Sequence, residues 1–234
     1  MSAFSLLWLI ARITITGKMH YFFLNWNLFL AFLPLLFTQL LSWNSALVRK
    51  RWVRGGIVLS WLLFFPNAPY ILTDLFHLAN SSSVPKWFDF ILILSYAWAG
   101  LLAGFISLRR IELTIFANVQ PRLLVFYSSA LIFLSAFGIY LGRFLRFNSW
   151  DVIQRPSVLL GEITERFTRP LEHPTTWGMT IGMGVLLTIM YWSLRMFSDP
   201  EPQEKVKRIS QGLLVNKRWN NSLSSFDCST RTDY

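Results

Sequence analysis

The chain has 234 residues, of which 53% are hydrophobic and only 15% are charged, and its formal net charge is +10. A soluble protein usually carries roughly a quarter charged residues, so this composition disfavours a soluble globular protein. In a membrane protein, basic loops and anionic lipid headgroups explain the positive charge better than nucleic acid does, and we expect no nucleic-acid partner. The single cysteine, Cys228, excludes an internal disulfide and a cysteine metal cluster.

Residues 1–20 form a short apolar N-terminal segment. Ser2 to Ala11 is apolar, but Arg12 follows and the stretch before Gly17 is short for a membrane span. It has no basic n-region and no clear cleavage site, so it does not resemble a signal peptide. We interpret it as a marginal sixth span or an interfacial helix.

Five later runs contain no Asp, Glu, Lys or Arg, and each is 19 residues or longer. A helix needs about 20 residues to cross a bilayer core of about 30 Å. The sequence therefore predicts an all-α membrane protein whose transmembrane domain, residues 21–197, is a bundle of five transmembrane helices. The expected spans are 21–43, 54–76, 87–108, 122–146 and 177–197.

The second span is interrupted by Pro66 and Pro69. Neither proline can donate a backbone hydrogen bond, and the ring of each clashes with the carbonyl four residues earlier, here those of Leu62 and Phe65. In lipid such carbonyls need other partners, so we expect the break to be buried in protein or to face water.

After the break, four polar residues follow the i, i+3, i+4, i+7 pattern of one helix face: Tyr70, Thr73, Asp74 and His77. An ionisable pair near membrane depth is a functional-site hypothesis by default. Asp74 and His77 are therefore candidate catalytic residues, and Asn67, Tyr70 and Thr73 are candidate substrate-binding residues. The alternative is that Asp74 and His77 only anchor the helix in the headgroup region.

A second polar segment ends the fourth span. Arg143 and Arg146 are three residues apart, which predicts a shared helix face, and Asp151 follows them. An arginine fork suits a carboxylate or phosphate, so these three residues are further candidate substrate-binding residues. The alternative is that the arginines snorkel to the interface.

The distribution of Lys and Arg predicts that 44–54, 109–122 and the polar tail at 198–234 are cytoplasmic, the tail being mostly disordered. The second and fourth spans then both run outward. We therefore expect Asp74, His77, Arg143, Arg146 and Asp151 to gather at the outer end of the bundle. Such a cluster would suit an anionic headgroup, or it would be an ion-pair network that only fixes helix packing.

The 143–177 segment contains a predicted amphipathic helix. Pro156 suits a first helical turn, and Leu159, Ile163 and Phe167 repeat at four-residue spacing. We expect this helix on the membrane surface or over the bundle. Pairs of glycines four apart in three spans predict close helix packing: Gly100 and Gly104, Gly138 and Gly142, Gly178 and Gly182.

Metal and cofactor signals are weak. Asp74 and His77 are fewer than the three protein ligands of a typical catalytic zinc site, so we predict no metal site. The sequence has no phosphate-binding glycine motif and no nucleophile elbow, and it identifies no cofactor.

The stretches 65–78 and 138–151 resemble the signature segments of a group of bacterial integral membrane proteins, catalogued as domain of unknown function 1361. The Asn67-Ala68-Pro69-Tyr70 and Gly142–Asp151 strings carry the resemblance, which covers about residues 25–197. It implies a multi-span protein of a bacterial cytoplasmic (inner) membrane. It supplies no activity, cofactor or catalytic residue.

Three functions stay open from the sequence. The first is an enzyme or binder for an anionic lipid or lipid-linked substrate at the outer membrane face. The second is a transporter-like component, because a broken span with polar groups is typical of transport helices. The third is a structural or assembly subunit, alone as a homo-oligomer or with a membrane-protein partner.

Overall fold

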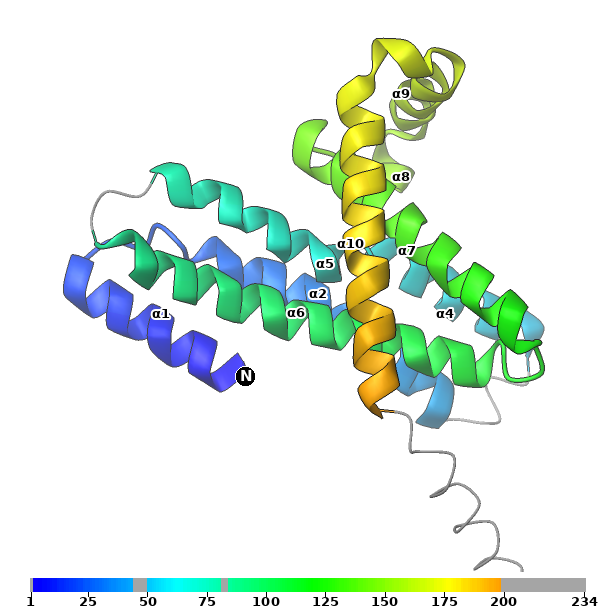
Figure 1. Ribbon diagram of the computed structural model, residues 1–234, viewed down its shortest axis with the longest axis horizontal. Coiled ribbons are helices and arrows are strands. Elements are labelled where there is room, and N and C mark those ends of the chain that lie inside the picture. The colour runs from blue at the N-terminus through cyan, green and yellow to red at the C-terminus, as the bar shows by residue number, and fades with distance from the viewer. Residues whose placement is uncertain (1, 44–49, 81–83, 199–234) are drawn as a thin grey trace, which may run out of the picture. The chain divides into compact units, whose positions relative to one another are not determined.

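The computed structural model describes residues 2–43, 50–80 and 84–198 (Figure 1). The predicted cytoplasmic tail with Cys228 and most of the 44–54 loop lie outside the described residues. The chain forms two compact units, Met1–Ile189 and Met190–Tyr234, and the described part of the second unit is the end of one helix. Within the described ranges every element is a helix, as predicted for this class.

Five helices or helical stretches are long and apolar enough to cross a membrane, which confirms the five predicted spans. They arise from the charge-free runs, because a backbone in lipid must satisfy its hydrogen bonds within the segment. They are α2 (Phe23–Trp43), the stretch Arg51–Leu78, α6 (Lys86–Thr114), α7 (Pro121–Phe144) and α10 (Pro174–Ser198). Between α7 and α10 lie α8 (Asp151–Gln154), α9 (Pro156–Thr168) and the short 3-10 helix η2 (Pro170–Glu172).

The N-terminal helix α1 (Ser2–Thr16) packs on α6 through a buried ion pair. Arg12 Nε lies 2.6 Å from Asp89 Oδ1, and the two side chains are 2% and 0% exposed. The Arg12 guanidinium also lies 4.4 Å from the ring centroid of Tyr21. Removing one partner of a buried pair costs about 3–5 kcal/mol, so this pair holds α1 on α6. Whether α1 spans the membrane or lies at its surface stays a prediction.

The predicted proline break divides the second span into α4 (Arg51–Phe64), α5 (Asn67–Tyr70) and the 3-10 helix η1 (Ile71–Asn80). The Phe65 carbonyl accepts a hydrogen bond from the Ala68 amide at 3.2 Å. The preceding carbonyl of Phe64 accepts from Asn67 Nδ2 at 3.0 Å. Phe65 and Ala68 are buried, so the broken stretch lies inside protein, as expected for non-helical backbone in a membrane protein.

Two of the predicted glycine pairs pack against this break. A Cβ built on Gly104 would lie 2.7 Å from Ala68 Cβ, and one built on Gly138 would lie 2.9 Å from Pro66 Cγ. Only glycine leaves room for such close approach. The third pair, Gly178 and Gly182, meets no described atom within 4 Å, so α10 does not use it for packing within the described chain.

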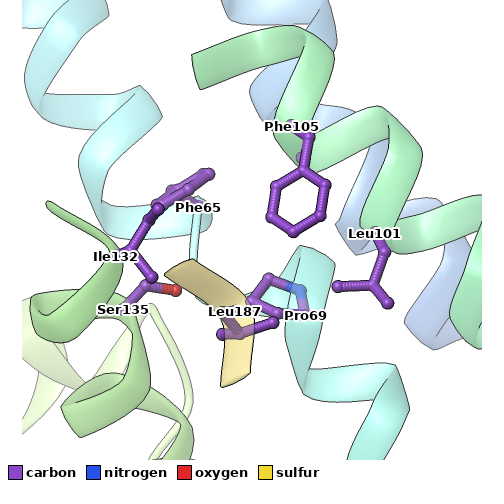
Figure 2. A pocket seen from close by; sticks show the side chains of 8 residues that line it. Phe65, Pro69, Leu101, Phe105, Ile132, Ser135 and Leu187 are labelled. Carbon is purple, nitrogen blue, oxygen red and sulfur yellow. The ribbon is translucent and has the colours of Figure 1, made fainter. Parts of the chain in front are cut away.

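A small void lies beside the break, where side chains of α5, α6 and α7 meet within the first unit (Figure 2). Its volume is about 10 Å³, and Pro69, Leu101 and Phe105 are among the side chains that line it. This is at the lower limit for one water, which would also need two to four polar partners. The Ser135 hydroxyl is the polar side-chain group of this lining, so the void is a packing feature and no binding site.

Candidate functional site

Thr73, Asp74 and His77 of the polar stripe lie on η1, whereas Tyr70 is the last residue of α5, so the expectation of one face with α-helical spacing is wrong here. The prolines interrupt the α-helical pattern, and the chain continues as a 3-10 helix of 10 residues. Three residues make one turn of a 3-10 helix, so residues three apart lie above one another. Asp74 and His77 therefore share one edge of η1, from which both reach Arg143.

Asp74 is almost fully buried, with 1% of its surface exposed. Its Oδ2 accepts a hydrogen bond from Asn27 Nδ2 of α2 at 2.8 Å. Its Oδ1 lies 3.5 Å from Arg143 Nη1 of α7. One carboxylate thus joins α2, η1 and α7, and both of its oxygens have partners.

His77 is partly buried next to the same guanidinium. Its Nε2 lies 3.2 Å from Arg143 Nη1, and because a guanidinium only donates, the imidazole nitrogen accepts. The Phe23 ring packs edge-on against His77 at 5.4 Å, and Arg143 lies over the Phe76 ring. The lone pair that a general base would use is therefore already engaged by Arg143.

The structure does not bring Arg146 into this cluster, and the prediction of a shared face with Arg143 is wrong. The helix α7 ends at Phe144, and Arg146 adopts a left-handed backbone conformation with φ of 59°. Its side chain is exposed. Since the helical register stops before Arg146, the three-residue spacing no longer places it beside Arg143.

Asp151 also has a separate role. Its Oδ2 accepts from the Asn148 amide at 2.7 Å, and its Oδ1 lies 3.2 Å from Arg155 Nη2. The side chain is buried at the start of α8. The structure therefore assigns Asp151 to the turn between α7 and α9 and not to the Asp74 cluster, which corrects the expected five-residue gathering.

The remaining predicted residues surround the break. Thr73 is buried and donates to the Tyr70 carbonyl of its own turn at 2.7 Å. Asn67 Nδ2 donates to Ser149 Oγ at 3.0 Å, and Ser149 donates to the Leu63 carbonyl at 3.1 Å. The two segments singled out in the sequence thus meet through polar contacts at both of their ends, at Asn67 with Ser149 and at Asp74 and His77 with Arg143.

A cavity of about 480 Å³ lies next to these contacts. Its wall is mostly aliphatic and aromatic, and it carries a few amide and hydroxyl groups. Side chains of α2, α4, α5, α7, α8 and α9 line it, including Leu30, Leu62, Leu141, Phe147 and Val152. All of these residues belong to the first compact unit.

The helix α9 contributes its apolar face to this cavity. Leu159, Ile163 and Phe167, which the sequence predicts as one face of an amphipathic helix, are all lining residues. The helix begins at Pro156, as expected. The sequence predicts two positions for α9, on the membrane surface or over the bundle, and its contacts with the cavity fit the second, in which α9 closes one side of the cavity.

Arg166 attaches α9 to α7. Its Nε donates to the Tyr140 hydroxyl at 3.4 Å, and its Nη1 donates to Glu162 Oε2 at 2.6 Å. Burial lowers the pKa of Arg166, but the hydrogen bonds to Tyr140 and Glu162 raise the pKa more, so it lies above its ordinary value. Arg166 therefore stays charged under all physiological conditions.

Asn27 connects the cavity to the ionic cluster. It lines the cavity and donates to Asp74, whereas Asp74, His77 and Arg143 are not lining residues. Asn27 is not among the residues predicted from the sequence, although Asn25 and Asn27 are polar residues inside the charge-free run 21–48, which is a readable signal. Ser149 and the cavity itself are not predicted either, because they depend on tertiary packing.

The chain matches a known protein family. A family model described as a protein of unknown function, DUF1361, matches residues 26–190. The chain belongs to the DUF1361 family. No curated protein and no solved structure matches the chain.

The match contains the break, the Asp74 cluster and the cavity wall of this DUF1361 protein, and it leaves out α1. Among the residues that the structure describes, no three His, Cys, Asp or Glu side chains come together as metal ligands. The chemistry that this DUF1361 chain offers in the described part is therefore an apolar cavity with neutral polar groups, backed by a buried ion-pair network.

Proposed function

We propose that this protein binds a lipid or lipid-linked molecule in the cavity between α2, α4, α7 and α9. The observation that carries the proposal is the cavity itself, about 480 Å³ of mostly apolar space. Ligand sites usually measure about 300–1,000 Å³ and combine apolar walls with a few polar groups. Because the walls come largely from membrane-spanning helices, the adjacent reservoir of apolar ligands is the bilayer.

The ion-pair cluster is proposed to orient the polar end of the ligand. Asp74 holds Asn27 on the cavity wall by a 2.8 Å hydrogen bond, and Arg143 holds Asp74 in turn. Binding is a better account of this cluster than proton transfer, since both Asp74 oxygens and His77 Nε2 already have partners. We place the cluster at the outer face of a bacterial cytoplasmic membrane, with the C-terminal tail in the cytoplasm.

Photolabelling tests the proposal. The purified full-length protein is placed in phospholipid vesicles that contain a small fraction of an uncharged monoacylglycerol with a diazirine on its acyl chain. After irradiation, we expect crosslinked peptides from the cavity wall, especially 134–149 and 159–167. Labelling that is spread evenly over all lipid-exposed helix faces would contradict a specific site.

A matched pair of variants on α9 sharpens this test. Ile163→Trp places a larger ring in the cavity wall, whereas Leu160→Trp changes a residue of the same helix that is 62% exposed and does not line the cavity. We expect Ile163→Trp to reduce cavity labelling several-fold and Leu160→Trp to leave it unchanged. If both variants change the labelling equally, the proposal that the cavity binds the lipid loses its support.

One observation favours a second candidate, a subunit of a membrane assembly. Built Cβ atoms on Gly55, Gly56, Gly178 and Gly182 meet no described atom within 4 Å. Small residues on open helix faces allow another helix to approach closely. Purification in mild detergent tests this candidate: a partner or second copy at fixed stoichiometry supports it, and a monomer alone contradicts it.

A further inference from the structure

The polar groups on the cavity wall are all uncharged. Among the described residues the lining includes Asn27, Asn67, Tyr70, Asn148 and Ser149, and it includes no Asp, Glu, Lys, Arg or His. An ionised carboxylate or phosphate that leaves water must be offset by a cation or by several donors. The lining of this cavity supplies no cation, which disfavours the anionic ligands that the arginine pair suggested from sequence.

The side-chain nitrogens of two wall amides donate to the protein, Asn67 with both of its N–H groups and Asn27 with one of its two. Asn27 Nδ2 donates to Asp74 Oδ2, and Asn67 Nδ2 donates both to the Phe64 carbonyl and to Ser149 Oγ. Because a carboxylate and a carbonyl only accept, these bonds fix which end of each amide is the nitrogen. The side-chain oxygens of Asn27 and Asn67 have no donor partner among the described residues, so they are acceptors for a ligand.

Tyr70 adds a third polar group that is open to a ligand. It lines the cavity, its ring packs against Gly142, and its hydroxyl has no hydrogen-bond partner in the described part of the chain. Ser149, in contrast, both accepts from Asn67 and donates to Leu63. Apart from the exposed Trp26 and Asn148, the wall therefore offers two amide oxygens and one phenol, which both donates and accepts. With no cation in the lining, this set favours an uncharged ligand with a hydrogen-bond donor over an anion, which only accepts.

We infer that the cavity takes an uncharged long-chain lipid that carries a free hydroxyl group at its polar end. This inference rests on the proposed lipid-binding function and names its ligand class. The hydrocarbon chain contacts the aliphatic wall, and the hydroxyl donates to Asn27 or Asn67 and exchanges a hydrogen bond with Tyr70. Asp74 and Arg143 act behind the wall by fixing the orientation of Asn27.

Competition for the photolabelling described above tests the ligand class. Monopalmitoylglycerol, palmitate and hexadecyl phosphate carry similar chains, and each is added at the same concentration and at a pH where both acids are ionised. We expect monopalmitoylglycerol to compete about tenfold better than either anion, a difference of about 1.4 kcal/mol. Equal or stronger competition by the anions would overturn the inference while the proposed function stands.

A tyrosine pair provides the variant control. Tyr70→Phe removes only the hydroxyl, and one neutral hydrogen bond is worth about 0.5–1.5 kcal/mol, so we expect a roughly two- to tenfold loss of monopalmitoylglycerol competition. Tyr127→Phe on α7 changes a residue outside the lining and should have no effect. If monopalmitoylglycerol competes equally well in Tyr70→Phe and in the wild type, the inference is also overturned. If the photoprobe does not label the cavity at all, the proposed function fails, and the inference fails with it.

Discussion

Arg143 of α7 forms an ion pair with Asp74 of η1, with 3.5 Å between Nη1 and Oδ1. The two side chains are 16% and 2% exposed, so the pair is shielded from water. It links the C-terminal ends of the second and fourth spans, which the chain order separates by the whole of α6. The pair therefore fixes how the proline break and α7 lie against each other.

The first prediction concerns this pair. Arg143→Met should lower the free energy of unfolding by about 3 kcal/mol, because it leaves a buried carboxylate without its cation. The double variant Asp74→Asn with Arg143→Met should lose less free energy of unfolding than Arg143→Met alone, because it leaves no charged side chain buried without a partner. Thermal unfolding of both variants in the same detergent measures the difference. A double variant that is less stable than Arg143→Met would argue against an ionic interaction.

The second prediction concerns the packing of the break. Gly138→Ala places a Cβ 2.9 Å from Pro66 Cγ, and such overpacking typically costs about 1–3 kcal/mol. Gly182→Ala is the matched control, because its Cβ would meet nothing within 4 Å. Alanine should stabilise the helix there by up to about 1 kcal/mol. Equal melting temperatures for the two variants would show that α7 does not pack on the break as described.

The third prediction concerns the attachment of α9. Arg166→Met removes the hydrogen bond that the charged guanidinium donates to Tyr140 of α7, worth about 1.5–3 kcal/mol, together with its bond to Glu162 within α9. Hydrogen exchange of the α9 amides should become at least tenfold faster. Arg169→Met is the control, since Arg169 is 65% exposed and its salt bridge within the described residues is to the exposed Glu172. Unchanged exchange in Arg166→Met would show that something else holds α9.

The fourth prediction concerns the side of the membrane. Single cysteines at positions 45, 81 and 146 are introduced into a Cys228→Ser background and treated with a membrane-impermeant thiol reagent in intact cells. Ser81→Cys and Arg146→Cys should label, and Ser45→Cys should not. Arg146 is chosen because its side chain is exposed, whereas the neighbouring Ser149 is hydrogen-bonded to Asn67. Labelling of positions 81 and 146 from opposite sides would contradict the shared outer face.

Much of the fold follows from the sequence, because the forces that decide it are local. Charge-free runs must be helical in lipid, and two prolines must interrupt a helix, so the spans and the break at Pro66 are predictable. The meeting of Asp74 and Arg143 also follows, since both spans run in the same direction. Asp74 and Arg143 each lie near the C-terminal end of their span, and this alone predicts that they meet, without any detail of side-chain packing.

What the sequence does not reveal depends on where helices end and on how side chains pack. Arg146 has the spacing of a helical partner of Arg143, but α7 ends at Phe144 before that spacing applies. Arg12 reads as the end of an apolar run, yet Asp89 pairs with it across 77 residues of chain. The cavity depends on volumes left between several helices, and no local pattern encodes such volumes.

The central claim is that one lipid occupies the cavity, and native mass spectrometry of the purified protein tests it most directly. Released gently from detergent, the wild-type protein and Leu160→Trp should each retain one bound lipid per chain, and fragmentation should identify that lipid as uncharged. Ile163→Trp should lose most of it. A wild-type protein that carries no lipid, or an Ile163→Trp protein that retains as much as the wild type, would contradict the account.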